Sequence, residues 1–328
     1  MNKTLVISYS EHGKAHEVAR VEEQNLPPVG PTQVLIEVKL AMINPSDVNT
    51  LEGTYATLPP LPAVGGRESV GVVAEVGSAV KNLKVGQWVQ PPQSLGAWRQ
   101  AVVAEAAEVV PFPEGLSLEQ AAMLSVNPAT AYLMLSEFVK LNAGDFFIQN
   151  AGNSGVGRCA IEIAKARGLK SINLVRREEL IPELKALGAD DVVLDDDNLR
   201  HKLKEITAGA PIKLALNTVG GDSSFRMSFA LAPGGAMVTY GGMSKQPVRV
   251  GTGLLIFKDI QLRGFWVSRW YKKASREQVT QLWEELAVLA RKGAFCVPIE
   301  KRYPLSEAKA ALEHAQQSSR GGKIAFQL

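Results

Sequence analysis

The sequence contains few cysteines, and the two that it has, Cys159 and Cys296, are far apart in the chain. Two cysteines cannot build a disulfide framework or a multi-cysteine zinc site, and this usage is typical of a reducing compartment. No apolar run approaches the roughly 18 residues that a membrane span requires. A strand predicted over Leu5 to Ser8 leaves no room for a leader before it. We therefore expect no membrane association and a cytoplasmic location, with a mature mitochondrial matrix form as the alternative.

An excess of charge of one sign is also absent. The 36 Lys and Arg residues nearly balance the 33 Asp and Glu residues, which gives a formal charge of +3 without any basic tract. Binding of nucleic acid relies on clustered Lys and Arg that contact phosphates, so we expect no nucleic-acid partner. The 328 residues correspond to two domains at roughly 100 to 200 residues per domain.

The first third of the chain is rich in Val, Pro and Gly. Short apolar segments such as Val34 to Val38 and Gly71 to Val76 are separated by turn clusters, a pattern typical of a small, irregular β barrel. Ser117 and Gln120 have the spacing of a capping box and predict the start of a helix. We place the first domain at residues 1–123.

From Asp145 onward, continuous apolar runs alternate with amphipathic stretches. This alternation predicts an α/β fold with a doubly wound parallel sheet covered by helices on both faces. We place this domain at residues 124–266. The remaining segment, 267–328, is predicted to contain helices from Arg276 to Arg291 and from Ser306 to about Gln316, followed by a strand from Lys323 to Gln327.

The most informative local feature is the glycine-rich turn that holds Gly152, Gly155 and Gly157. It follows the predicted strand FFIQN and opens a helix. Glycine there lets a phosphate approach the backbone and the first N–H groups of the helix. The spacing differs from the common G-x-G-x-x-G, so a plain turn between a strand and a helix is the alternative; the surrounding βα units favour dinucleotide binding.

The next predicted strand ends at Val175 and is followed by Arg176 and Arg177. An NAD-specific fold has an acidic residue at this place for the ribose hydroxyls, whereas two guanidinium groups suit a 2′-phosphate. This favours NADPH. Because Glu178 and Glu179 follow at once, an ordinary solvated strand end is the alternative interpretation.

The order of these parts resembles the medium-chain dehydrogenase/reductase superfamily over nearly the whole chain. Many members hold a catalytic zinc, but the matching stretches here read AMINPSD and VGGRES, with Asn44 and Arg67 where ligands are expected. The four-cysteine structural lobe is missing too, and the four histidines show no paired spacing, so we predict no metal. Within the zinc-free branch, the sequence resembles the mitochondrial-type 2-enoyl thioester reductases through the strings NPSDVNTLEGTY, LPPLPAVGG, NPATAYLML, QNAGNSGVG, INLVR, YGGM and GFWVSRW.

This resemblance implies a GroES-like β-barrel catalytic domain, to which the C-terminal segment returns, and a Rossmann cofactor domain. It also implies reduction of a trans-2-enoyl group, carried on coenzyme A or acyl carrier protein, by NADPH. Tyr55 is implied as the catalytic residue, and Asn44, Trp266 and Trp270 are candidates for contacting the substrate. Cofactor contacts are implied for Asn127, Asn153, Ser154, Gly155, Val156, Arg176, Arg177, Tyr240, Gly241, Gly242, Met243, Phe265, Trp266, Val267 and Lys323.

The sequence departs from the family pattern at two places. Arg67 and Ser69 interrupt a stretch that usually reads Asn-Glu-Gly, which bears on substrate preference. Glu178 follows the two arginines where another basic residue is common, which bears on cofactor preference.

Reduction of an enoyl thioester delivers hydride to Cβ, places negative charge on the thioester oxygen and protonates Cα. A tyrosine of ordinary pKa, about 10, is neutral at pH 7 and keeps a transferable proton. Tyr55 lies in the Gly- and Pro-flanked loop GTYATLPP, from which we expect it to reach a cleft between the domains. A hydrogen bond to the oxyanion is the alternative role, and a loop tyrosine that caps apolar surface is the structural alternative. Trp266 and Trp270 are expected either to line an acyl channel or to pack at a domain boundary.

Three functions remain open from the sequence: the enoyl thioester reductase, a quinone or enone oxidoreductase with the same plan, and a non-catalytic NADPH-binding protein. The family and the apolar segment GLLIF before Ile260 also predict a homodimer.

Overall fold

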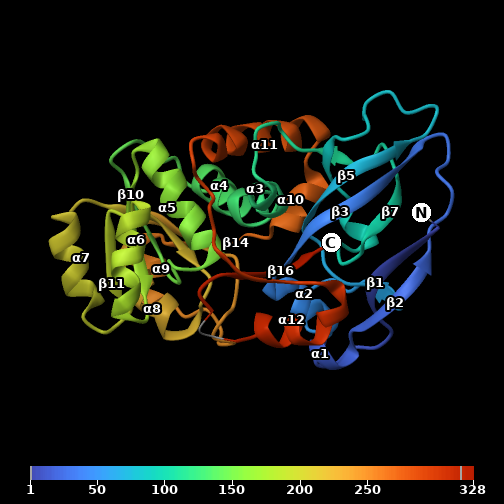
Figure 1. Ribbon diagram of the computed structural model, residues 1–328. Coiled ribbons are helices and arrows are strands. Elements are labelled where there is room, and N and C mark those ends of the chain that lie inside the picture. The colour runs from blue at the N-terminus through green and yellow to red at the C-terminus, as the bar shows by residue number, and fades with distance from the viewer. Residues whose placement is uncertain (1, 318–319) are drawn as a thin grey trace. The chain divides into compact units, whose positions relative to one another are not determined.

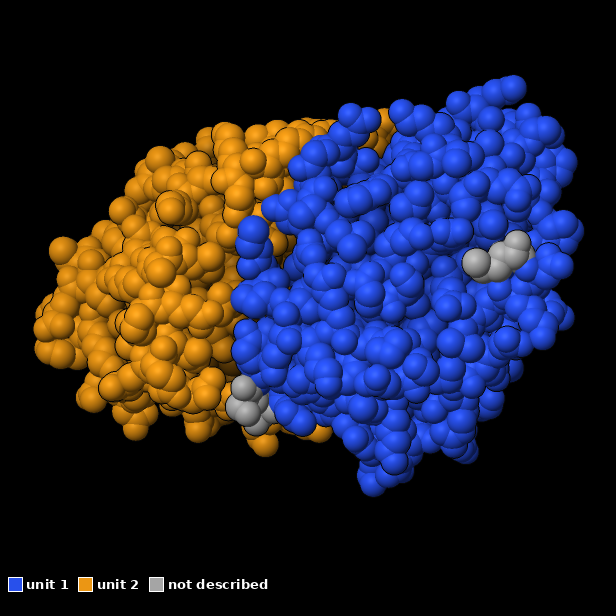
Figure 2. Space-filling view, in the orientation of Figure 1, with its two compact units in different colours: residues 1–125, 296–328 blue, residues 126–295 orange. Residues whose placement is uncertain are grey.

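The computed structural model describes residues 2–317 and 320–328. The chain divides into two compact units, the first formed by residues 1–125 and 296–328 and the second by residues 126–295 (Figure 2). The chain first passes from one unit to the other after residue 125, two residues beyond the boundary predicted from the sequence. It returns to the first unit between Phe295 and Cys296, whereas the sequence predicted this return between residues 266 and 267. The reason is that the helix predicted over Arg276 to Arg291 packs within the second unit.

The first unit contains two sheets. A three-stranded sheet has the order β2-β1-β4, and a seven-stranded sheet has the order β15-β16-β3-β5-β6-β8 with β7 paired to β3 (Figure 1). The strands are β1 (Lys3–Tyr9), β2 (Arg20–Asn25), β3 (Gln33–Ile43), β4 (Ala63–Val64), β5 (Ser69–Val76), β6 (Trp88–Gln90), β7 (Ala101–Glu105), β8 (Val110–Pro111), β15 (Ile299–Tyr303) and β16 (Lys323–Gln327).

Short helices accompany these sheets: α1 (Ala15–Val18), α2 (Pro45–Leu51), η1 (Gln93–Leu95), α3 (Leu118–Met123), η3 (Leu305–Glu307) and α12 (Ala308–Ala315). The predicted capping box of α3 is confirmed, since Gln120 N–H donates to Ser117 Oγ and Ser117 N–H donates to Gln120 Oε1. The returning strand β16 pairs antiparallel with β3, with Ile324 opposite Ile43. Residues at the two ends of the chain therefore meet in one sheet, whose core includes Trp98 packed edge-on against Phe326.

The second unit is built on a six-stranded sheet, parallel throughout, with the order β11-β10-β9-β12-β13-β14. This is the doubly wound order in which the first strand lies beside the point where the order reverses. The strands are β9 (Phe146–Gln149), β10 (Lys170–Val175), β11 (Asp191–Leu194), β12 (Ile212–Asn217), β13 (Leu231–Thr239) and β14 (Gln261–Gly264). The central strands are buried on both faces, which explains their continuous apolar sequences.

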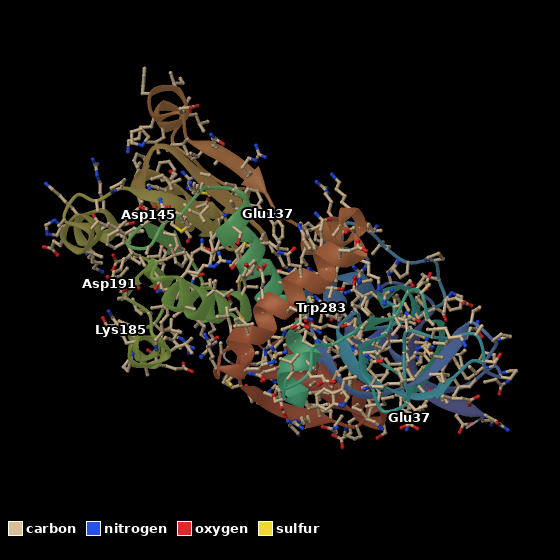
Figure 3. All side chains as sticks on the ribbon, turned by 90° about the horizontal axis from the view of Figure 1, so that it is seen from above. Glu37, Glu137, Asp145, Lys185, Asp191 and Trp283 are labelled. Atoms are coloured by element: carbon tan, nitrogen blue, oxygen red, sulfur yellow. The ribbon has the colours of Figure 1, made fainter. Side chains whose placement is uncertain are left out.

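The helices of this unit are α4 (Asn127–Glu137), α5 (Gly155–Arg167), η2 (Glu178–Leu180), α6 (Ile181–Leu187), α7 (Leu199–Thr207), α8 (Gly221–Ala230), α9 (Thr252–Lys258), α10 (Val267–Lys273) and α11 (Arg276–Arg291). Helix α11 belongs here because Glu285 accepts a hydrogen bond from the Tyr132 hydroxyl of α4. Helix α10 is held to α4 as well, because Trp270 Nε1 donates to Glu137 Oε1 at 2.8 Å. Figure 3 labels Glu137 of α4 and Trp283 of α11. None of the helices in the described ranges is both long and apolar enough to cross a bilayer.

Candidate functional site

The glycine-rich turn joins β9 to α5 as predicted. Ser154 caps α5, since its Oγ accepts from Gly157 N–H at 3.1 Å, and the Asn153 carbonyl accepts from Arg158 Nε at 3.2 Å. The first N–H groups of a helix have no partners inside it. Those at the start of α5 therefore provide donors and a positive dipole end, the usual arrangement for a phosphate group.

Close packing explains why the turn needs glycine at three positions. A Cβ on Gly157 would lie 2.6 Å from the Gly152 carbonyl oxygen, and one on Gly152 would lie 3.0 Å from Asn173 Cβ. A Cβ on Gly155 would lie 2.8 Å from Asn127 Nδ2. The G-x-x-G-x-G spacing thus has a steric basis in this chain, although it differs from the common fingerprint.

Three buried polar atoms in this unit lack hydrogen-bond partners among the described residues: the acceptor Gln149 Oε1 and two groups that can donate, Asn127 Nδ2 and the Tyr240 hydroxyl. The Tyr240 hydroxyl faces the Ser154 and Thr218 side chains without completing a hydrogen bond to either, and burial raises the pKa of Tyr240 to about 12. An unpaired buried donor costs free energy unless a ligand satisfies it. Donors of this kind beside the cap of α5 fit the phosphate and carbonyl oxygens of a dinucleotide.

The other predicted cofactor residues of this unit occupy strand ends and loops. Arg176 and Arg177 are exposed after β10, and Arg177 Nε lies 3.6 Å from Glu179 Oε1. Phe265 continues β14, where its N–H donates to the Thr239 carbonyl at 2.9 Å. The residues after β13 form a loop held to β12: Met243 N–H donates to the Thr218 carbonyl at 2.8 Å. The list is completed by Val156 in the first turn of α5, Gly241 and Gly242 in the loop, and Trp266 and Val267 at the start of α10.

Trp270, the second candidate for the acyl channel, lies within α10 and donates its indole N–H to Glu137. Its ring packs edge-on against Tyr271 with the centroids 5.4 Å apart. Trp266 caps the same helix, and Arg269 Cζ lies 5.9 Å from its ring centroid. A substrate role for either tryptophan stays a prediction.

A second cluster of polar side chains is buried in the first unit around Asn44. Asn44 N–H donates to Asp47 Oδ2 at 2.8 Å, and Asn44 Nδ2 donates to Glu68 Oε2 at 2.9 Å. The Lys323 ammonium donates to Asn44 Oδ1 and lies 3.9 Å from Glu68 Oε2. Lys323, predicted to contact the cofactor, is thus held by Asn44 and Glu68, and its cofactor role stays a prediction.

Sequence reasoning missed Asp47 and Glu68, both fully buried acids. Burial raises the pKa of Asp47 to about 6, although the Asn44 N–H donor and the charges of Arg67 and Lys323 pull it downward. The capping-box spacing of Asn44 and Asp47 was the available signal for the first acid. No local sequence pattern indicated a role for Glu68, because its partners Asn44 and Lys323 are distant in sequence.

Tyr55 lies in the loop that follows α2. The N–H groups of Thr54 and Tyr55 both donate to the Asn49 carbonyl, at 2.9 and 3.1 Å, so the loop is tied to the helix. The Tyr55 side chain is partly exposed, and Arg67 Cζ lies 5.0 Å from its ring centroid. This is a cation–π contact.

The chemistry of the Asn44 cluster does not favour a metal ion. Within residues 2–317 and 320–328, no group of three or more His, Cys, Asp and Glu side chains is placed to hold one. The Lys323 ammonium beside Glu68 would repel a second cation. The absence of a metal stays a prediction of the sequence.

Comparison with known proteins follows the same division of the chain. Residues 30–114 match the alcohol dehydrogenase GroES-like domain, and residues 155–287 match the zinc-binding dehydrogenase domain. The chain is 44% identical over 322 residues to the mitochondrial enoyl-acyl-carrier-protein reductase of Bos taurus, covering 96% of this chain and 86% of that protein. The human enzyme of the same name is 45% identical over 317 residues, covering 95% and 85%. The chain belongs to the mitochondrial-type enoyl thioester reductases of the medium-chain dehydrogenase/reductase superfamily.

Solved structures of this enoyl thioester reductase family share the whole fold. The complex of Etr1p with NADP and crotonyl-CoA is 31% identical, with a TM-score of 0.91 and full coverage of both chains. The Etr1p/Etr2p heterodimer from Candida tropicalis is 32% identical, with a TM-score of 0.90 and the same coverage. The predicted fold class, a GroES-like β domain with a Rossmann domain, is confirmed.

Proposed function

We propose that this chain reduces trans-2-enoyl thioesters with NADPH. The observation that carries the proposal is its full-length similarity to Etr1p, whose solved complex contains NADP and crotonyl-CoA. The residues present agree with that chemistry, since a capped helix and two unpaired buried donors suit a dinucleotide and a phenol lies in the GroES-like unit.

The side chains of the second unit are proposed to bind the cofactor. The chemistry that NADPH supplies when bound is the hydride that Cβ of the substrate receives. The cap of α5 binds phosphate, Asn127 and the Tyr240 hydroxyl donate to polar atoms of the dinucleotide, and Arg176 and Arg177 bind the 2′-phosphate. Lys323 is proposed to contribute through its ammonium charge.

Tyr55 is proposed to protonate Cα. Once Cβ has received hydride, the electron pair of the enolate forms a C–H bond at Cα and the phenolic O–H bond breaks. Donation of a hydrogen bond to the thioester oxyanion would also require this hydroxyl. Loss of the hydroxyl in Tyr55→Phe therefore lowers kcat under either role. Because solvent deuterium enters Cα under either role, its stereochemistry in the product made by Tyr55→Phe separates them: loss of a single configuration at Cα indicates that Tyr55 is the acid, and retention indicates the hydrogen bond to the oxyanion.

A quinone or enone reductase is the second candidate, favoured by one specific similarity. A putative NADPH:quinone reductase from Bacillus thuringiensis is 27% identical, with a TM-score of 0.91 and 99% coverage of both chains. The fold of the chain is therefore common to both activities, and measured turnover of their substrates is needed to distinguish them.

The deciding experiment measures NADPH oxidation with a panel of enoyl-CoAs, enoyl-acyl-carrier proteins, quinones and enones. We expect enoyl thioesters to be reduced with much higher kcat/KM, and Tyr55→Phe to lower that activity by about 100-fold or more, the usual size of a lost acid. Tyr303→Phe is the matched control, because it removes a hydroxyl that bonds His314 in the same unit. Faster turnover of quinones would transfer the assignment to the second candidate, and cofactor binding without any turnover would support the non-catalytic alternative. The two carriers in the panel decide between coenzyme A and carrier protein.

We also propose a homodimer formed through the second unit. The apolar side chains of α9 are exposed, with Ile256 at 67% and Phe257 at 85% of their surface, and β14 lies at the edge of the sheet. An exposed apolar helix beside an unpaired strand edge is a usual interface between subunits. Light scattering is expected to give twice the mass of the chain, and a monomer at working concentration would contradict the proposal.

The compartment stays a prediction. The sequence favours the cytoplasm, whereas the names of the mammalian relatives place those proteins in mitochondria. Fractionation of the source cells decides between the two.

A further inference from the structure

Arg67 connects three parts of the segment that carries Tyr55. Its Cζ lies 5.0 Å from the Tyr55 ring centroid, and its Nη2 donates to the Thr57 carbonyl at 3.3 Å and to Thr50 Oγ1 at 3.4 Å. Thr50 is in α2 and is itself anchored, because its hydroxyl donates to the Ser46 carbonyl at 2.7 Å. The guanidinium group thus links the helix, the tyrosine ring and the loop beyond it.

The positive charge of Arg67 is not cancelled by a salt bridge. An arginine side chain stays protonated in proteins, and Arg67 forms no ion pair within 4.0 Å in the described part of the chain. The charged and titratable groups around it are Asp47 from α2, Tyr9 from β1, Glu68 beside β5 and Lys323 from β16. Asn44 and Lys323 contact these acids directly, whereas the guanidinium group acts on Asp47 through its charge alone and contacts the Tyr55 ring directly.

This charge matters at one moment of the proposed reaction. When the Tyr55 O–H bond breaks and the new C–H bond forms at Cα, the phenol becomes a phenolate whose negative charge spreads over the ring. A cation over that ring stabilises the phenolate more than the neutral phenol. The phenolate afterwards takes a proton from solvent water, which restores the enzyme.

We propose that Arg67 is a positioning residue for Tyr55, which holds its loop and stabilises the phenolate left by proton transfer. The inference rests on the proposed function. It concerns a residue that departs from the family pattern, in which this position is usually Asn. The contact therefore belongs to this chain's own version of the site.

Kinetics of Arg67→Gln test the proposal. We expect kcat for crotonyl-CoA to fall about tenfold, which corresponds to about 1.4 kcal/mol, while the KM for NADPH is unchanged. Arg67→Lys keeps the charge without the planar fork and should restore part of kcat. Arg67→Asn is a second neutral variant in case the glutamine variant folds poorly. Arg20→Gln, which alters an arginine of the β2 strand, is the control and should retain wild-type kcat.

A double-mutant comparison shows the path of the effect. If Arg67 acts through the phenol, adding Arg67→Gln to Tyr55→Phe should leave the residual kcat unchanged. A further tenfold loss in that background would mean that Arg67 acts on the substrate directly, and would overturn the proposal.

A measurement without turnover keeps this inference separable from the proposed function. Amide hydrogen exchange of the loop that carries Tyr55 is compared in the wild type, in Arg67→Gln and in Arg20→Gln, without substrate. Loss of the guanidinium contacts to Thr50 and Thr57 should speed exchange of the Thr54 and Tyr55 N–H groups in Arg67→Gln only. Unchanged exchange would overturn the proposal even if enoyl thioesters are substrates. Faster exchange in a protein without enoyl reductase activity would leave the contact standing and reject the function.

Discussion

Glu162 on α5 provides a direct test of how burial affects stability in the second unit. The Phe295 N–H donates to both of its carboxylate oxygens, at 3.1 Å each. Phe295 is 1% exposed and has a positive φ of 65°. Burial raises the pKa of Glu162 to about 7, although the Phe295 N–H donor and the charges of Arg158 and Lys165 pull it downward.

The sign of the effect follows from the direction of this shift. The pKa of Glu162 is about 7 in the folded protein against a reference value of 4.5, so the folded state binds the proton more tightly than the unfolded state does. The stabilisation is present in full below pH 4.5 and is lost as the pH rises through 7. At about 1.4 kcal/mol per pH unit, the loss above pH 7 amounts to about 3 kcal/mol.

Glu162→Gln removes the charge but keeps a carbonyl oxygen that accepts the Phe295 N–H. We expect the free energy of unfolding of the variant to exceed that of the wild type by up to about 3 kcal/mol at pH 8. The difference should shrink towards zero near pH 4.5. Urea unfolding of the cofactor-free protein, followed by circular dichroism and tryptophan fluorescence, measures both values. Glu178→Gln, an exposed glutamate of the same unit, is the matched control and should change little at either pH.

A variant that is less stable than the wild type at pH 8, or a difference that does not depend on pH, would refute this reasoning. The first result would mean that the ionised carboxylate is worth more to the Phe295 N–H than its burial costs. The second would mean that Glu162 carries the same charge in the folded and unfolded chains.

Two further predictions concern the cofactor residues. A Cβ on Gly241 would overlap the Thr218 hydroxyl, whereas one on Gly242 meets nothing within 4 Å. Gly241→Ala should therefore destabilise the protein by about 1 to 3 kcal/mol and weaken NADPH binding, while Gly242→Ala keeps the wild-type melting temperature. Equal effects of the two substitutions would contradict this prediction. Replacing Arg176 and Arg177 together by Ala should raise the KM for NADPH about tenfold or more, because charge-assisted hydrogen bonds to the 2′-phosphate are lost. The KM for NADH, which lacks this phosphate, should be unchanged. Parallel changes with both cofactors would show that the arginines do not bind the 2′-phosphate.

Local sequence patterns predicted the elements whose signals are local. The helix from Arg276 to Arg291 has the predicted bounds, because Ser275 caps it and its buried residues recur at helical spacing. The parallel sheet was equally evident, since strands buried on both faces have continuous apolar sequences. The point where the chain returns to the first unit was not predicted, because it depends on α11 packing against α4 through Tyr132 and Glu285. These two residues are 153 positions apart in the sequence.

The candidate site shows the same limit. The glycine turn, its capping serine and the arginines after β10 are contiguous in sequence and were predicted. The Asn44 cluster was not, because it joins residues 44, 68 and 323 through the pairing of β16 with β3. The family resemblance named Asn44 and Lys323 separately but gave no reason to expect them in contact.

The charges of this cluster explain why Arg67 is more than a local substitution. Two buried acids, Asp47 and Glu68, require compensating positive charge, and Lys323 supplies only one cation. Arg67 supplies the second, and its charge lowers the pKa of Asp47 against the larger effect of burial. Removing Arg67 should therefore raise the pKa of Asp47 further, because one of the two charges that oppose the effect of burial is lost. An NMR titration of the Asp47 carboxyl in the cofactor-free protein measures this, with Arg20→Gln as the control. An unchanged pKa in Arg67→Gln would show that the guanidinium charge does not compensate the buried acid.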